Sequence, residues 1–203
     1  MSFLDLLDLE EIAADLYQAT SPLKGRTRVY GGQVVAQALE AARRTVDPAQ
    51  FVHSLHGYFI RSGDENRPII LDVDRIRDGR SFSTRRVVAK QAGGAIFNLS
   101  ASFHRLEPDE EFSRPVDISG VASPDECELE VWDDISPVRL VPDTPPGRAM
   151  AWCKIVIPER LPDDDHLHAI AVAYASDHIP MDSIRSGHPG TEDWDSFMGA
   201  SLD

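Results

Sequence analysis

Cysteines are scarce in this chain, long apolar runs are missing, and basic side chains are outnumbered by acidic ones. Cys127 and Cys153 are the two cysteines in 203 residues. Two are too few for a disulfide framework and they lack a metal-ligand spacing, so we expect a reducing compartment and no metal. No run approaches the roughly 18 to 20 apolar residues that a membrane-spanning helix needs, and Met1–Asp5 lacks the layout of a secretory signal. We therefore expect a cytoplasmic protein without a membrane partner.

The shortage of basic residues argues against nucleic-acid binding, which draws most of its affinity from neutralising phosphates. Lys and Arg number 20 against 34 Asp and Glu, for a net charge of -14 at pH 7. The charge is unevenly distributed. Residues 107–134 carry eleven acids and one base, whereas residues 67–90 carry seven bases and three acids. The basic stretch is typical of a solvated strand face with scattered ion pairs, and it is also compatible with a site for a small polyanion.

The hydrophobic pattern of the first half predicts two helices and then a run of strands. Residues 4–18 match a short amphipathic helix. Residues 33–44, which follow Gly31-Gly32, are apolar on nearly every side, as in a helix wrapped by other structure. Strand-like segments joined by turn signals such as Asp78-Gly79 come next, at residues 51–61, 69–77, 82–91 and 95–105. This order predicts an α+β unit at residues 1–106, an antiparallel sheet curled around a central helix, which is a hotdog.

The remainder of the chain is predicted to hold a linker and part of a second unit. Residues 107–147 are acidic and rich in proline, so we expect a surface linker with one short helical turn near residues 127–133. A strand at 149–157 and a buried helix from about Asp164 then begin the second unit, residues 148–203. Pro180 removes a backbone donor from that helix and predicts a kink beside Asp177.

A faint internal repeat relates the two halves. Gln33 precedes Ser54-Leu55-His56 by 21 residues, and Asp177 precedes Ser201-Leu202-Asp203 by 24. Each pair places a polar residue in a buried helix ahead of a similar strand start. On this repeat the second hotdog is expected to be truncated, with one strand and the first residues of another. Such a unit cannot cover both faces of its helix by itself.

Several stretches together resemble the acyl-CoA thioesterase II family, which includes peroxisomal acyl-CoA thioesterases. The resemblance extends over nearly the whole chain except the acidic linker. It implies a double hotdog that hydrolyses fatty acyl-CoA thioesters to free acid and CoA without a cofactor. The matching stretches are Tyr30-Gly31-Gly32-Gln33-Val34-Val35-Ala36-Gln37-Ala38-Leu39, Val52-His53-Ser54-Leu55-His56-Gly57-Tyr58-Phe59, Arg77-Asp78-Gly79-Arg80-Ser81-Phe82-Ser83-Thr84-Arg85-Arg86-Val87, Ala101-Ser102-Phe103 and Tyr174-Ala175-Ser176-Asp177.

The resemblance also implies the catalytic residues. The family uses an Asp on the second helix, a Thr or Ser at a strand start and a Gln on a later strand; the first two match Asp177 and Ser201, and the Gln has no counterpart before Asp203. Thioester hydrolysis needs an activated water and a donor for the developing oxyanion. Asp177 is expected to accept the proton of the water and Ser201 to orient it. Asp177 could instead face solvent, and Ser201 could be an ordinary strand serine.

Candidate residues for binding acyl-CoA lie in the first half. Gly32 and Gln33 stand at the helix start, where a carboxamide can support the chemistry but cannot act as a base. His56 is a further candidate, although a lone strand histidine is more often structural. Arg80 and Arg85, in the basic stretch, are candidates for the CoA phosphates because arginine pairs with phosphate through two hydrogen bonds.

Other functions fit less well. Ser62-Gly63-Asp64-Glu65-Asn66-Arg67-Pro68-Ile69-Ile70 resembles the signature of hotdog enoyl-CoA hydratases, but Ile70 stands where their histidine is needed. Gly31-Gly32-Gln33 resembles the tripeptide of peptide-release factors, which we reject because this chain is acidic and the tripeptide enters a buried helix. A non-catalytic acyl-CoA-binding module is the third alternative. The family resemblance also predicts a homo-oligomer, and a peroxisomal address stays open because its signal would follow Asp203.

Overall fold

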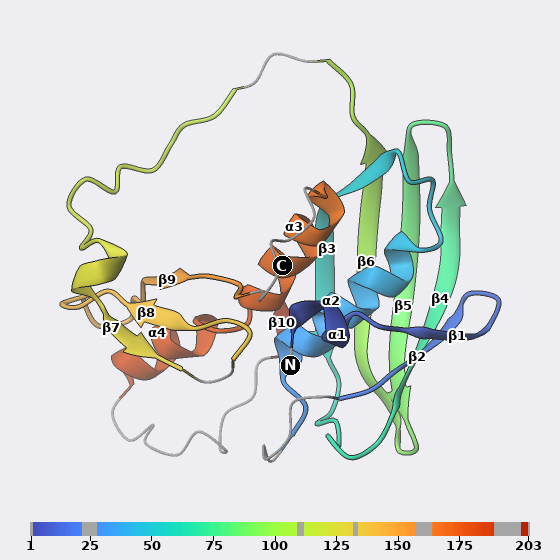
Figure 1. The fold of residues 1–203 in the computed structure, drawn as a ribbon, viewed down its shortest axis with the longest axis horizontal. Coiled ribbons are helices and arrows are strands. Elements are labelled where there is room, and N and C mark those ends of the chain that lie inside the picture. The colour runs from blue at the N-terminus through green and yellow to red at the C-terminus, as the bar shows by residue number, and fades with distance from the viewer. Residues whose placement is uncertain are drawn as a thin grey trace.

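The computed structural model describes residues 2–21, 28–108, 112–131, 134–156, 164–188 and 200–202 (Figure 1). The helices are α1 (Phe3–Leu6), α2 (Gly31–Arg43), α3 (Asp165–Ala175) and α4 (Pro180–Gly187), with a 3-10 turn at Pro124–Glu126. The strands are β1 (Glu10–Ala13), β2 (Leu16–Ala19), β3 (Gln50–Phe59), β4 (Ile69–Asp78), β5 (Phe82–Gln91), β6 (Gly94–Arg105), β7 (Glu128–Glu130), β8 (Val138–Leu140), β9 (Ala151–Cys153) and β10 (Ser201–Leu202). Within these ranges, every helix is too short or too polar to cross a membrane.

Seven strands form one antiparallel sheet in the order β1-β2-β4-β5-β6-β3-β10. The four long strands predicted from the sequence are confirmed within about two residues at each end. Hairpins join β4 to β5 and β5 to β6 at the predicted turns, and Gly94 has a φ of 103°, which favours glycine. The sheet therefore follows from alternating apolar residues and turn chemistry that the sequence displays directly.

Helix α2 lies in the curve of this sheet (Figure 1). Its side chains are buried from Gly32 to Ala42, as its nearly continuous apolar surface predicts. Three of the large side chains in the core around it, Leu39, Phe97 and Phe103, are at most 1% exposed. The small alanines of α2 let the sheet approach closely, so the first half is a hotdog as expected.

The predicted helix at residues 4–18 is wrong beyond Leu6. Helix α1 ends there, and the chain continues as the β1–β2 hairpin, in which Asp15 adopts a φ of 58° that no α-helix contains. Strand β2 pairs with β4, and Val73 donates a backbone hydrogen bond to the carbonyl of Asp15 at 2.9 Å. Pairing with the edge of the sheet therefore overrides the helical pattern of this segment.

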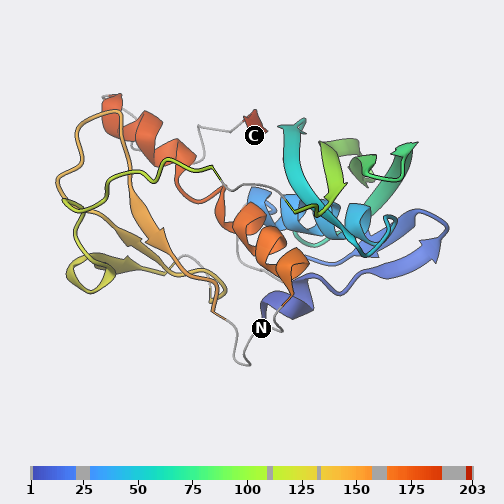
Figure 2. The same ribbon diagram turned by 90° about the horizontal axis from the view of Figure 1, so that it is seen from above.

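The segment after the first unit is more ordered than predicted. Strands β7 and β8 fall in residues 107–147, where a linker was expected, and with β9 they form a three-stranded antiparallel sheet. The helical turn expected at residues 127–133 lies earlier, at Pro124–Glu126, and the strand expected at 149–157 is shorter. Figure 2 shows α3 beside α2, with α4 and the small sheet together on the side of α3 that faces away from α2.

Candidate active site

Asp177 lies in the turn between α3 and α4. Helix α3 ends at Ala175, and the N–H of His178 donates to the carbonyl of Ala175 at 3.1 Å, which tightens the turn. Pro180 then begins α4, where the first helical turn tolerates its missing donor. The kink predicted at Pro180 is therefore a complete break, and Asp177 sits within it.

The carboxylate of Asp177 meets the amino end of α2. Its Oδ2 accepts a hydrogen bond from the backbone N–H of Gly32 at 3.0 Å. The amino end of a helix carries partial positive charge and unpaired N–H groups, so it stabilises an anion. Of the residues predicted for the site, Gly32 and Asp177 are thus brought together.

Two glycines permit this close approach. A Cβ atom on Gly31 would lie 2.4 Å from Oδ2 of Asp177, and one on Gly32 would lie 2.2 Å from the carbonyl oxygen of Tyr174. Both distances are shorter than non-bonded atoms tolerate. The Gly31-Gly32 pair therefore lets the end of α3 and the α3–α4 turn pack directly against the start of α2.

Burial raises the pKa of Asp177 to about 6, and the hydrogen bond from Gly32 and the positive charge of Arg28 lower it by smaller amounts. A carboxylate with this pKa is mostly ionised at pH 7 and is a better proton acceptor than an ordinary aspartate. This pKa is compatible with the predicted role of Asp177 as a general base. The alternative of an Asp exposed to solvent does not agree with this placement.

An aromatic cluster surrounds the turn. The ring of Tyr30 contacts Tyr174 edge-on, with centroids 5.1 Å apart, and stacks on His178 at 5.1 Å. The hydroxyl of Tyr30 donates to the carbonyl of Tyr174 at 3.0 Å. Phe59 adds a further ring beside Gly31. These rings shield the Asp177 turn on the side of α2.

Ser201 can be located by its backbone, while its side chain lies outside the described residues. It pairs with Tyr58 of β3, and the N–H of Phe59 donates to the carbonyl of Ala200 at 2.9 Å. Since the ring of Phe59 lies beside Gly31, strand β10 begins near the Asp177 turn. Its role as water-orienting residue stays a prediction.

Gln33 and His56 point away from this turn. The carboxamide of Gln33 is fully buried and donates to the hydroxyl of Ser21 at 3.0 Å, so it anchors the segment before α2. His56 is on β3 between Leu55 and Gly57. Leu55 shares one face of this strand with Phe59, whose ring reaches Gly31. Because successive side chains of a strand face opposite ways, His56 lies on the outer face, where its ring contacts Tyr58 at 4.5 Å.

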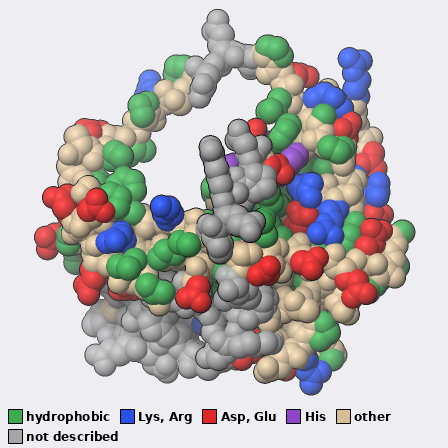
Figure 3. Space-filling model, in the orientation of Figure 1, with side chains coloured by type: hydrophobic (Ala, Val, Ile, Leu, Met, Phe, Trp, Pro, Cys, Tyr) green, Lys and Arg blue, Asp and Glu red, His purple; other side chains and the backbone are tan. Residues whose placement is uncertain are grey.

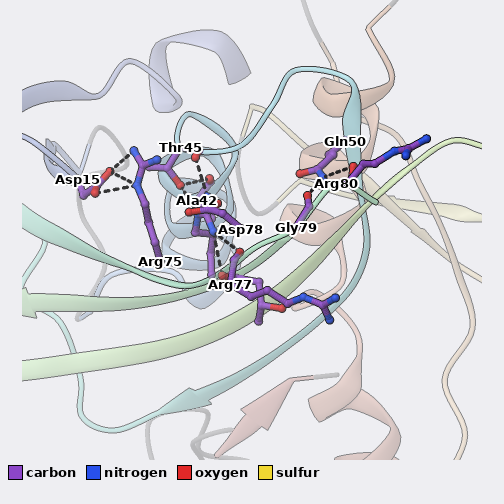
Figure 4. A network of polar contacts seen from close by, with 11 residues as sticks. Asp15, Ala42, Thr45, Gln50, Arg75, Arg77, Asp78, Gly79 and Arg80 are labelled. Atoms are coloured by element: carbon purple, nitrogen blue, oxygen red, sulfur yellow. Dashed lines mark hydrogen bonds and ion pairs between the residues drawn. The ribbon is translucent and has the colours of Figure 1, made fainter. Parts of the chain in front are cut away.

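Arg85 is a structural residue rather than an exposed phosphate ligand. Its guanidinium is fully buried, and its nitrogen atoms donate to Thr45, the carbonyls of Arg77 and Thr84, and the carboxylate of Asp78. These contacts use all five N–H donors, so none is left for CoA. The assignment of Arg85 to CoA binding is therefore not supported. Figure 4 labels Thr45, Arg77 and Asp78, three of the residues that accept hydrogen bonds from Arg85.

Arg80 keeps the features that the prediction requires. It is exposed at the turn between β4 and β5, and its side chain extends away from the network (Figure 4). Five of the seven bases in residues 67–90 form ion pairs with carboxylates, and Arg80 is not among them. Basic and acidic side chains are intermixed over this side of the molecule (Figure 3). Most of the basic stretch is thus an ion-paired strand face.

An apolar pocket of about 550 Å³, largely open to solvent, lies on the other side of the turn, between it and the three-stranded sheet; this pocket is called the apolar cavity below. Ser176 and Ile179, which flank Asp177 in sequence, line it together with Trp152 and Met150. The indole of Trp152 donates to the carbonyl of Ala122 at 2.9 Å and so ties the preceding segment to the sheet.

Over the part of the chain that is described, no cluster of three or more His, Cys, Asp or Glu is arranged to hold a metal ion.

Sequence reasoning missed several residues that shape the site. The sequence does not predict the contacts of Tyr30 and Gly31 with the turn, the stacking of His178 on Tyr30, or the effect of the Arg28 charge on Asp177. Tyr30 and Gly31 stand at the start of a stretch that matches the family, next to Gly32. Their position in that motif was the available signal, but only the fold brings them to residues 174–178.

Comparisons with known proteins identify the relatives of this chain. Residues 19–104 match the model of the acyl-CoA thioesterase N-terminal domain. Acyl-coenzyme A thioesterase 8 of Mus musculus is 44% identical over 114 residues, which cover 54% of this chain and 36% of that protein. The match thus spans about a third of the length of this curated relative.

Solved structures extend the similarity to the second half. The acyl-CoA thioesterase II TesB2 of Mycobacterium marinum is 36% identical, with a TM-score of 0.77, and the alignment covers 94% of this chain and 72% of that one. A hotdog protein of Alicyclobacillus acidocaldarius shares the fold at 17% identity, with a TM-score of 0.73 over 91% of this chain and 72% of that one.

Proposed function

Because this chain belongs to the acyl-CoA thioesterase II family, we propose that the protein hydrolyses acyl-CoA thioesters to a free acid and CoA, with Asp177 as the general base. The observation that carries this proposal is the partly buried carboxylate of Asp177, which is hydrogen-bonded to the amino end of α2. In this mechanism the carboxylate takes a proton from water as the water oxygen attacks the thioester carbonyl carbon. The C–S bond then breaks, and the departing thiolate receives the proton from Asp177.

Other residues are assigned supporting roles. The backbone of β10 supports placing Ser201 where its hydroxyl orients the attacking water. The helix end at Gly32 holds Asp177 in its ionised form. Arg80 is proposed to meet the phosphates of CoA, since its side chain is exposed and forms none of the ion pairs that occupy five of the seven bases in residues 67–90. Gln33 and His56 are proposed to act through the structure around the site rather than by contact with the reacting atoms.

The cavity on the other side of the turn is proposed to hold the acyl chain. Its lining is largely aliphatic and aromatic, as in pockets for apolar ligands, and its volume falls within the usual range of roughly 300 to 1,000 Å³. Ser176 and Ile179 join this cavity to the segment that carries Asp177. An acyl chain held there would leave its carbonyl group near the turn.

Product analysis in isotopically labelled water tests the reaction. Incubation with an acyl-CoA in water enriched in oxygen-18 should release free thiol and place the label in the carboxylate of the free acid. Incubation with crotonyl-CoA should yield thiol without hydration of its double bond. Hydration without thiol release would favour the enoyl-CoA hydratase alternative, and tight binding without any product would favour a non-catalytic binding module.

We also propose that the protein is a cytoplasmic homo-oligomer. Tyr58 and Phe82 are 55% and 40% exposed, and both lie on the outer face of the sheet, where a second copy could cover them. Light scattering at several concentrations tests the oligomer: a mass that stays at that of one chain, 22.5 kDa, would contradict it.

A further inference from the structure

We propose that Tyr30 is a positioning residue that fixes the α3–α4 turn, and with it Asp177, on the amino end of α2. This inference rests on the proposed function of Asp177. Tyr30 is the residue before α2, and its own side chain makes no capping hydrogen bond to that helix. Its hydroxyl instead donates across the interface to the carbonyl of Tyr174 at 3.0 Å. A side chain at the start of α2 thus donates a hydrogen bond to the end of α3.

The carbonyl of Tyr174 lies in the last turn of α3, where the break in the helix changes its hydrogen bonding. The last four carbonyls of an α-helix have no intrahelical partner. In a continuous helix the N–H of His178 would donate to Tyr174, but here it donates to Ala175. The hydroxyl of Tyr30 therefore donates to the carbonyl that the N–H of His178 would reach in a continuous helix. The same break in the helix places Asp177 in a turn.

Tyr30 also holds the turn from its other end. Its ring stacks on His178, with centroids 5.1 Å apart and planes inclined by 24°. Residues 174 and 178 lie on either side of Asp177 in sequence, so one side chain contacts both ends of the segment. His178 is 3% exposed and Tyr174 is fully buried, which leaves the two ends of the turn little room to move.

The next two residues continue the same contact. Gly31 packs against Oδ2 of Asp177, and the N–H of Gly32 donates to that oxygen. Three consecutive residues thus meet the turn in three ways, by a side-chain hydrogen bond, by close packing and by a backbone hydrogen bond. Loss of the Tyr30 bond should let the turn move away from α2, so that water reaches the carboxylate.

Tyr30→Phe tests this assignment, with Tyr58→Phe as the matched control. Both remove one hydroxyl, but Tyr58 lies on the outer face of β3 and is 55% exposed. Tyr30→Phe keeps the ring that stacks on His178. The carboxyl carbon-13 resonance of Asp177, followed by NMR against pH, reports the turn directly and requires no catalytic activity.

We expect the titration midpoint of Asp177 to fall by about half a unit in Tyr30→Phe, because burial is the main cause of its raised pKa. The midpoint should be unchanged in Tyr58→Phe. In the thiol-release assay, kcat should fall about tenfold in Tyr30→Phe while KM stays within about twofold, because binding contacts are retained.

An unchanged Asp177 midpoint in Tyr30→Phe would overturn the proposal. A general change of the amide spectrum would also overturn it, because the hydroxyl would then support the whole fold rather than the turn. Failure of the proposed function would give a different result from failure of this inference. The wild type would then release no thiol, but the difference in the Asp177 titration midpoint between wild type and Tyr30→Phe could still be measured.

Discussion

The backbone N–H of Gly32 donates a hydrogen bond to the carboxylate of Asp177 at 3.0 Å, joining residues that are 145 positions apart in sequence. This bond connects the helix of the first hotdog with the break between α3 and α4. Near pH 7 the carboxylate is ionised, held by a helix end and largely withdrawn from water. Burial raises the pKa of this carboxyl, while the hydrogen bond from Gly32 opposes that rise and fixes the position of Oδ2. These two effects lead to the following predictions.

Gly31→Ala should displace Asp177. The added Cβ would lie 2.4 Å from Oδ2 and 2.9 Å from the ring of Phe59, so the carboxylate must move outward. Thiol release should fall about a hundredfold, because misplacement of a catalytic group by about 1 Å has effects of that size. Gly93→Ala is the matched control, since nothing lies within 4 Å of its Cβ position. Equal activity of the two variants would show that the packing at Gly31 is unimportant.

Asp177→Asn should stabilise the fold at neutral pH. The folded-state pKa is raised from 3.8 to about 6, so this carboxyl favours folding most below pH 3.8, and that contribution is lost as the pH rises through 6. The amide carries no charge and its oxygen can still accept from Gly32. We expect a gain of up to about 3 kcal/mol above pH 7, measured by urea unfolding at pH 4 and pH 8. Asp125→Asn, at an exposed position, should show no such gain.

Arg85→Ala should destabilise the protein strongly, by about 3 to 5 kcal/mol, because it leaves Thr45 and several carbonyls without their buried donor. Arg86→Ala is the adjacent control: its guanidinium is half exposed and pairs with Asp74, so a loss of at most about 1 kcal/mol is expected. Thermal unfolding followed by circular dichroism measures both. A similar melting temperature for the two variants would contradict the structural role of Arg85.

If the proposed activity is correct, Ala151→Phe should restrict hydrolysis to shorter acyl chains. Ala151 lines the apolar cavity, and a phenyl ring would fill part of its volume. The ratio kcat/KM for a long-chain acyl-CoA should fall at least about tenfold, while that for a short-chain substrate should change little. Val172→Phe serves as control because Val172 is 70% exposed on α3. A uniform loss for all chain lengths would place the acyl chain elsewhere.

Much of the fold could be predicted because its signals are local. The hairpin turns at Asp78-Gly79 and Gly93-Gly94 and the apolar surface of α2 need no knowledge of distant residues. The helix at residues 4–18 failed for the opposite reason: pairing of β2 with β4 depends on a partner more than 50 positions away, Leu16 facing Asp72. Short strands of that kind leave a pattern that a helix also fits.

The candidate site was only partly predictable. Asp177 and Gly32 belong to motifs, but their contact arises from the way α3 packs against α2. For Arg85 and His56 the sequence did hold a usable signal. Arg85 lies on the same face of its strand as Val87 and Ala89, which are buried in the core. His56 instead stands between Leu55, which packs against the core, and the buried Gly57. The period of two along each strand therefore indicates that Arg85 points inward and His56 outward.

The pH dependence of thiol release tests the role of Asp177 most directly. For the wild type we predict that kcat/KM for an acyl-CoA rises with pH, reaches half its maximum near pH 6 and is constant above it, since only the ionised carboxylate accepts a proton. Asp177→Asn should lose this limb together with about 10² to 10⁴ of the rate. Retention of the wild-type rate and of the same acidic limb in Asp177→Asn would contradict the assignment of Asp177 as the base.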